Sequence, residues 1–178
     1  MTPNHRFKIT EEYAKWTALS ATRSGCPLKS KRDVYGLIEQ IDFNTIICGS
    51  NPVKEIEFHE WHKRNTEKLN GIRSELRIGW ATKIINIYLK TTTYIGSIGR
   101  PKLVNWIHPP IDSGLWKGIS EKYSKETQII EKTHFKTKIK DIKSYEDYLQ
   151  IITGIKLIAT IERIIPIEIE HLWKGTEY

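Results

Sequence analysis

Apolar side chains recur at helical spacing along most of the chain. The clearest pattern runs from Ser74 to Lys90, where apolar residues cover well over half of the helical circumference. Gly79, Lys83 and Asn86 fall with Lys90 on the narrow strip that remains. A helix that is apolar over so much of its surface is expected at the centre of the fold, with neighbours on several sides.

Start and stop signals predict further helices on both sides of this one. The expected starts, in chain order, are Thr10, Ser30, Pro52, Ser74, Gly99, Asp112 and Ser144. The last start leads into a long helix that Pro166 breaks, and a short piece from Ile167 to Trp173 follows. The segment from Phe43 to Cys48 is short and β-branched, so both helix and strand stay open there.

Residues 117–143 interrupt the pattern, because lysines alternate there with threonine, His134 and Phe135. We expect an extended or loosely helical crossover over this segment. The other segments predict an all-α fold, an irregular bundle of roughly five to six main helices. A chain of 178 residues without internal repeats is expected to form a single domain spanning residues 1–178.

Composition supplies bulk for a core and gives no sign of export. The chain has six tryptophans and eight tyrosines. It has no apolar run long enough for a membrane span, and its N-terminus lacks the apolar run of a signal peptide. Two cysteines, Cys26 and Cys48, fit reduced thiols better than an exported disulfide. We expect a soluble cytoplasmic protein with no membrane partner.

Charge adds a preference for anionic partners. The net charge is +7, and residues 117–143 hold eight lysines against four acids, whereas residues 144–178 hold three basic residues against six acids. A basic segment of this kind favours nucleic acid or a nucleotide as partner. The alternative is that the basic and the acidic segments pack against each other, and a lysine-rich composition also arises from an AT-biased genome.

The polar strip of the central helix is the first candidate site. Lys83, Asn86 and Lys90 place two ammonium groups and an amide along about two helical turns. Such a row suits phosphate or a nucleic-acid backbone, because lysine acts as a point charge and asparagine adds directional hydrogen bonds. The alternative is a solvated helix face, but the narrowness of the strip favours a groove.

The sequence His108-Pro-Pro-Ile-Asp112 is the second candidate. Its prolines have fixed φ and restrict how the two polar residues move. Asp112 could orient the imidazole or raise its pKa, so that His108 acts as an acid or base with Arg100 nearby to hold phosphate. Alternatively, Asp112 only caps a helix and His108 is a turn residue. A pocket with an aromatic wall is expected from Trp80, Trp106 and Trp116.

A metal site has one set of candidates. Glu55, His59 and His62 could share one helix face, but the spacing of the two histidines departs from the zincin motif. Flanked by Phe58 and Trp61, such a pair more often serves packing. We therefore expect no metal and no cofactor, and the chain has no Walker, dinucleotide-binding, GxSxG or CxxC motif.

Two motifs carry a resemblance to known proteins. The pattern Gly79-x-Ala81-x-Lys83-x-x-Asn86, with His108-x-Pro110-x-Asp112 after it, resembles uncharacterised bacterial helical proteins over about a fifth of the chain. At the level of fold class the chain also resembles the HEPN ribonucleases of bacterial defence and toxin systems. Seven residues separate Arg100 from His108, and as many separate Arg163 from His171. This spacing departs from the HEPN motif, in which the arginine stands closer to the histidine within one helix.

Two functional hypotheses follow. The first is a nucleic-acid- or nucleotide-directed protein, in its catalytic form a metal-independent ribonuclease-like enzyme with His108, Asp112 and Arg100 at its centre. The second is a non-catalytic helical module that binds nucleic acid or a protein partner through its lysines. Whether the chain is catalytic and whether it forms homo-oligomers stay open at this point.

Overall fold

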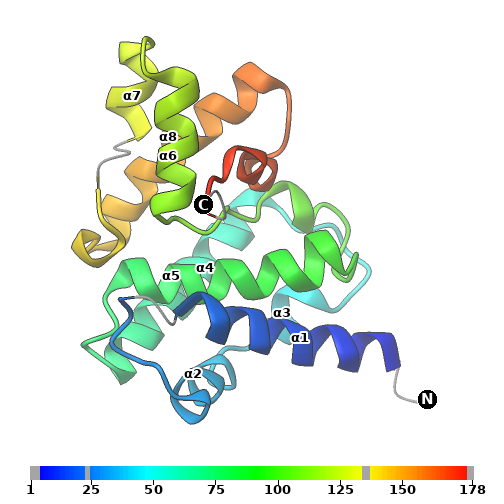
Figure 1. Ribbon diagram of the computed structural model, residues 1–178. Helices are drawn as coiled ribbons and strands as arrows, with labels where there is room; N and C mark the ends of the chain where they lie inside the picture. The colour runs from blue at the N-terminus through cyan, green and yellow to red at the C-terminus, as the bar shows by residue number, and fades with distance from the viewer. Residues whose placement is uncertain (1–4, 23–24, 134–136, 176–178) are drawn as a thin grey trace.

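The computed structural model describes residues 5–22, 25–133 and 137–175, and every regular element in these ranges is helical (Figure 1). The all-α prediction is therefore confirmed for the described residues. The α-helices are α1 (His5–Thr22), α2 (Lys31–Ile38), α3 (Phe43–Ile47), α4 (Glu55–Ile72), α5 (Ile78–Leu89), α6 (Ser113–Tyr123), α7 (Thr127–Thr133) and α8 (Tyr145–Glu162). The shorter helices are η1 (Lys90–Ile95), η2 (Leu103–Asn105), η3 (Ile139–Asp141) and η4 (Pro166–Leu172).

Helix α5 lies at the centre of the molecule, as its apolar pattern predicts. All of its residues from Ile78 to Leu89 are buried. It packs against α1 and α4, and in the view of Figure 1 it separates α1–α3 from the group formed by α6, α7 and α8. Its last turn widens into the π-helix η1, whose threonines at 91–93 are also buried.

The buried apolar side chains form two clusters, one on each side of α5. The first joins α1–α5 through residues such as Phe58 and Ile84, and the second joins α6–α8 and η4 through residues such as Tyr148 and Ile155. Helix α5 contributes to both clusters, because its first residue, Ile78, belongs to the second. No helix in the described part of the chain is long and apolar enough to cross a membrane.

Several predicted helix starts are confirmed by their caps. The side chains of Ser30, Asp112 and Ser144 each accept a hydrogen bond from a backbone N–H in the first turn of α2, α6 and α8. Ser144 forms a full capping box with Asp147. Each cap satisfies a backbone donor that a helix start otherwise leaves without a partner.

Other predicted starts are wrong, and hydrogen bonds of the segments before α4 and α5 explain two of them. Helix α4 begins at Glu55 instead of Pro52, because the Val53 N–H donates to the Pro101 carbonyl and holds this stretch extended. Helix α5 begins at Ile78 instead of Ser74, because the intervening residues form a turn whose Leu76 carbonyl accepts from Asn70.

Two further elements depart from the predicted helices, and a third decides between the two open alternatives. Helix α1 begins at His5, upstream of Thr10. The helix expected from Gly99 is only the single turn η2. Residues 43–47, which were open between helix and strand, form α3 with Asp42 as the N-cap.

The crossover predicted for residues 117–143 is more helical than expected. Helix α6 continues to Tyr123 and α7 follows, because Ile119, Tyr123 and Ile129 are buried in the second cluster. The histidine and the phenylalanine at 134 and 135 lie outside the described residues.

Two glycines set how closely the helices approach each other. A Cβ at Gly118 in α6 would overlap the carbonyl oxygen of Leu172 in η4, and a Cβ at Gly79 in α5 would overlap the carbonyl oxygen of Ile139 in η3. The Gly79 N–H also donates to the Ile142 carbonyl at 3.3 Å. Backbone therefore lies directly against backbone at both contacts.

We predict that Gly118→Ala lowers the free energy of unfolding by about 1–3 kcal/mol, because the new methyl group forces η4 away from α6. Gly36→Ala in α2 is the matched control, since a Cβ there meets nothing within 4 Å. The control should raise the free energy of unfolding by roughly 0.5–1 kcal/mol, as Ala for Gly does in a helix interior. Urea denaturation followed by circular dichroism measures both variants, and equal effects would contradict the close approach.

Candidate functional site

The middle of the polar strip on α5 is a fully buried hydrogen-bond network around Asn86. The Asn86 carboxamide nitrogen donates to the Tyr148 hydroxyl at 2.8 Å and to the Pro109 carbonyl at 3.3 Å. Its oxygen lies 2.9 Å from Nε2 of His62, and the other ring nitrogen of His62 lies 2.8 Å from the Tyr145 hydroxyl. Three helices and the 108–110 turn therefore meet at one side chain.

These contacts fix the direction of each hydrogen bond. The Pro109 carbonyl can only accept, so the Asn86 nitrogen must face it and the Asn86 oxygen must face His62. His62 therefore donates through Nε2. The Tyr148 hydroxyl accepts from Asn86 and can donate its own proton to Nδ1 of His108, 2.9 Å away. Both imidazoles are neutral in this arrangement.

Burial keeps the imidazoles of His62 and His108 neutral. Desolvation lowers the pKa of His62 to about 4 and lowers the pKa of His108 well below its usual value. His108 is fully buried, and its Nε2 has no hydrogen-bond partner among the described residues. This position gives no support to the predicted role of His108 as an acid or base that meets a substrate near neutral pH.

Asp112 does not orient His108, and that hypothesis is wrong. One of its oxygens accepts from the Leu115 N–H at 3.0 Å, which makes Asp112 the N-cap of α6. The same oxygen accepts from the Trp173 indole N–H at 3.0 Å, and the other accepts from the Lys83 ammonium at 3.2 Å. The capping role is therefore confirmed, and the charge partner of Asp112 is Lys83.

The two lysines of the strip each have a carboxylate partner. Lys83 is 8% exposed and pairs with Asp112, while Lys90 forms an ion pair with Glu170 in η4. Burial raises the pKa of Glu170, although the charge of Lys90 opposes this change. Lys83 and Lys90 thus line a groove beside α5, whereas Asn86 between them is buried in the core, and neither ammonium group carries uncompensated charge.

Arg100 lies in a different environment. Its guanidinium donates to Glu57 at 2.5 Å and to the backbone carbonyls of Asn51 and Thr45 at 2.9 and 3.2 Å. These contacts attach the loop before α4 to the loop after η1. The structure does not bring Arg100 together with His108 or with the lysines of the strip.

The candidate metal ligands are engaged with other groups. Both ring nitrogens of His62 have hydrogen-bond partners in the buried network. Lys156 bonds to Glu55 at 2.6 Å and to His59 at 3.1 Å. In the ranges that the structure describes, no group of three or more His, Cys, Asp or Glu side chains is arranged to hold a metal ion.

A cleft with a volume of about 510 Å³ opens beside Lys83, at the junction between α5 and α6. We call it the tryptophan cleft. Its lining residues are Ala21, Gly25, Trp80, Lys83, Asp112, Ser113, Gly114, Trp116, Thr137, Lys138, Ile139, Lys140, Trp173 and Gly175. A smaller cavity of about 220 Å³ shares Lys83, Asp112 and Trp173 with it and continues along α5 to Lys90.

Three indoles line the cleft, and two of them are those expected from the sequence. Trp80 and Trp116 are almost buried, whereas Trp173 is 40% exposed. Trp106 lies elsewhere and donates to the Val53 carbonyl at 2.9 Å. Trp173 was not predicted, since it stands far along the chain in a short terminal element without a distinctive pattern. It reaches the cleft because its indole bonds to Asp112.

The rim of the cleft carries lysines that the predicted site lacked. Lys138 and Lys140 are exposed, and within the described part of the chain neither forms an ion pair with an acid. The lysine-rich composition of residues 117–143 pointed to this segment, but not to these two positions. The cleft therefore combines three indoles with the Lys83–Asp112 ion pair and with two exposed lysines, Lys138 and Lys140.

This arrangement can hold a flat ring against an indole and an anionic group at the rim. The chain matches no protein-family model, no curated protein and no solved structure. The chemistry of the cleft is therefore the guide to function.

We predict that the stability of the protein falls as the pH drops below about 6.5. The unfolded chain then protonates His62 and His108, while burial keeps both neutral in the folded protein, in which the pKa of His62 is about 4 and that of His108 is well below its usual value. Each histidine contributes about 1.4 kcal/mol per pH unit over this window.

His108→Asn tests this assignment, because its amide oxygen can still accept from the Tyr148 hydroxyl but does not titrate. The slope of the unfolding free energy against pH, measured between pH 6.5 and 5, should fall by about 1.4 kcal/mol per pH unit. His5→Asn is the matched control for the loss of one imidazole. An unchanged slope in His108→Asn would show that His108 is protonated in the folded protein.

Proposed function

We propose that the tryptophan cleft binds a nucleotide or an unstacked base of a single-stranded nucleic acid. The observation that carries the proposal is the presence, around one cavity of about 510 Å³, of three indoles and two lysines that form no ion pair with another described residue. This volume falls within the range of about 300–1,000 Å³ common among small-molecule sites. Bases stack on indoles, and lysines attract the phosphate that accompanies each base.

Trp173 is the indole best placed to receive a base, because it is the most exposed of the three. Its hydrogen bond to Asp112 fixes one edge of the ring, so that little side-chain freedom is lost when a ligand stacks on it. Trp80 is covered on one side by the Lys83 ammonium, 5.6 Å from the ring centroid. We therefore assign Trp80 a supporting role in the wall of the cleft, without direct stacking on the base.

The phosphate contacts are assigned to Lys138 and Lys140 in place of the predicted Lys83 and Lys90. An ammonium that is already paired with a carboxylate gains less from a phosphate than an unpaired one. The net charge of +7 adds a long-range attraction for polyanions. Binding, without a catalytic role for the buried His108, is the activity that this arrangement supports best.

The paired substitution Lys138→Gln and Lys140→Gln tests the rim. In a titration with a short single-stranded RNA, the affinity should fall and the slope of log K against log salt should become shallower by about 1.4, or about 0.7 for each lost phosphate contact. The control is Lys8→Gln with Lys102→Gln, which removes the same charge at exposed positions outside the cleft. Equal slopes for the two double variants would contradict the assignment.

Trp173→Ala tests the stacking wall. The variant should weaken binding of the same RNA by about 5- to 150-fold, which corresponds to roughly 1–3 kcal/mol for one base stacked on one aromatic ring. Trp16→Ala is the matched control, because Trp16 is 49% exposed on α1 and does not line the cleft. Fluorescence anisotropy of a labelled RNA measures both, and a Trp173 variant that binds like the control would remove the cleft as the site.

A further inference from the structure

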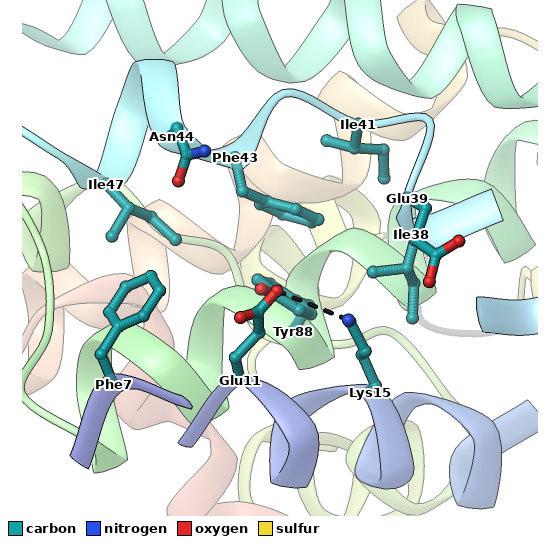
Figure 2. A pocket seen from close by; sticks show the side chains of 10 residues that line it. All are labelled: Phe7, Glu11, Lys15, Ile38, Glu39, Ile41, Phe43, Asn44, Ile47 and Tyr88. Atoms are coloured by element: carbon teal, nitrogen blue, oxygen red, sulfur yellow. Dashed lines mark ion pairs between the residues drawn. The ribbon is translucent and has the colours of Figure 1, made fainter. Parts of the chain in front are cut away.

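A second cavity lies between α1, the α2–α3 segment and the end of α5. Its volume is about 210 Å³, enough for several water molecules. The lining residues are Phe7, Glu11, Lys15, Ile38, Glu39, Ile41, Phe43, Asn44, Ile47 and Tyr88. It shares no residue with the tryptophan cleft, so it is a separate site (Figure 2).

The floor of this cavity is aromatic and rigid. Phe43 and Tyr88 stack with ring centroids 3.8 Å apart and an interplanar angle of 21°. Figure 2 shows these two rings at the centre, with isoleucines from α2 and α3 on either side and Phe7 of α1 below. A ligand needs an apolar part of modest size to cover such a floor.

Polar groups with unused hydrogen-bonding capacity surround the floor. Tyr88 is 3% exposed, yet its hydroxyl has no hydrogen-bond partner among the described residues. Burial raises the pKa of Tyr88, so the hydroxyl keeps its proton and can donate. The Tyr88 oxygen is not one of the fully buried polar atoms that lack a partner among the described residues, so the hydroxyl is accessible from the cavity that it lines and can bond to a ligand there.

The Lys15 ammonium is the second donor. It lies 3.5 Å from both Glu11 and Glu12, longer than the roughly 2.7–2.9 Å of a charge-assisted hydrogen bond. Burial opposes its charge, but the two glutamates together raise the pKa of Lys15, so it stays an ammonium group. An ammonium group has three N–H donors, so Lys15 can keep these two contacts and donate a further bond to a ligand carboxylate.

Acceptors lie beside these donors. Glu11 faces the cavity from α1, and the carboxylate of Glu39, at the end of α2, forms no ion pair within the part of the chain that the structure describes. In Figure 2 the two carboxylates lie on either side of the Lys15 ammonium. The amide of Asn44 points toward the cavity from α3 and adds another polar contact.

We propose that this cavity binds a small zwitterion of the amino-acid class with an apolar side chain. The Lys15 ammonium and the Tyr88 hydroxyl would hold the ligand carboxylate, Glu39 and Glu11 would hold its ammonium, and its side chain would cover the Phe43 ring. A purely cationic ligand would leave the Tyr88 hydroxyl and the remaining Lys15 donor unused, and a purely anionic ligand would meet the carboxylates of Glu11 and Glu39. Only a ligand that carries both charges satisfies both sets of groups.

Calorimetric titration of the full chain with L-leucine tests the proposal. Leucinamide lacks the carboxylate and isocaproate lacks the ammonium, so each should bind at least about tenfold more weakly than leucine. An absence of leucine binding at millimolar concentration would overturn the proposal, and so would equal binding of leucine and either analogue.

Variants then assign the contacts. Tyr88→Phe keeps the stacked ring and removes only the unpartnered hydroxyl, so the protein should remain folded while the affinity for leucine falls about tenfold. Glu39→Gln should weaken leucine binding similarly. Glu12→Gln is the matched control, because Glu12 also contacts Lys15 but does not line the cavity. Loss of binding in this control, or unchanged binding in Tyr88→Phe, would contradict the site.

Lys15→Met separates charge recognition from folding. This variant should remove most of the advantage of leucine over leucinamide, since only the ligand carboxylate contacts Lys15. A preserved advantage would overturn the assignment, with circular dichroism reporting whether the variant is folded. The outcome is independent of RNA binding by the tryptophan cleft, because the two cavities share no residue.

Discussion

The carboxamide of Asn86 is the point at which the two halves of this protein are joined. It is fully buried, and its hydrogen bonds reach α4, α8 and the 108–110 turn. Leaving any of these buried partners unpaired would cost about 1–3 kcal/mol, so the network permits only one relative position of these segments. Apolar packing around it supplies most of the stabilisation but is less directional.

This constraint explains why the histidines serve structure. His62 and His108 act as neutral connectors between hydroxyl and amide groups, and their burial prevents them from gaining charge. The aspartate after the proline pair performs a separate task at the start of α6. Two residues that stand close together in the sequence thus belong to different parts of the structure, because the prolines direct the chain from the core to the cleft.

The spacing of apolar and polar residues was sufficient to predict features that are determined within a single helix, such as its polar strip and its N-cap. The spacing of polar residues along α5 placed Lys83, Asn86 and Lys90 on one narrow strip, and Ser30 and Ser144 were recognised as caps from their local pattern. Such features need only the geometry of a single helix and a few neighbouring residues.

What depends on tertiary contacts could not be predicted in this way. Asp112 and Glu170, the partners of the strip lysines, lie far along the chain, and nothing in their local sequence links them to α5. Helix α4 starts late because a backbone donor is used by a distant loop. The position of the Tyr88 hydroxyl in a cavity could not be predicted either, since the helical pattern predicts only that the ring is buried.

The glycine contacts have a consequence for selectivity. Gly79, the residue before Trp80, lies against the backbone of Ile139, and Gly118 of α6 lies against the backbone of η4. Trp80 and Ile139 both line the tryptophan cleft, so the distance between its walls is set by main-chain atoms that have no rotamers to change. In the proposed site, walls held by main-chain atoms would keep a fixed spacing, which would favour a single planar ring over a base-paired duplex.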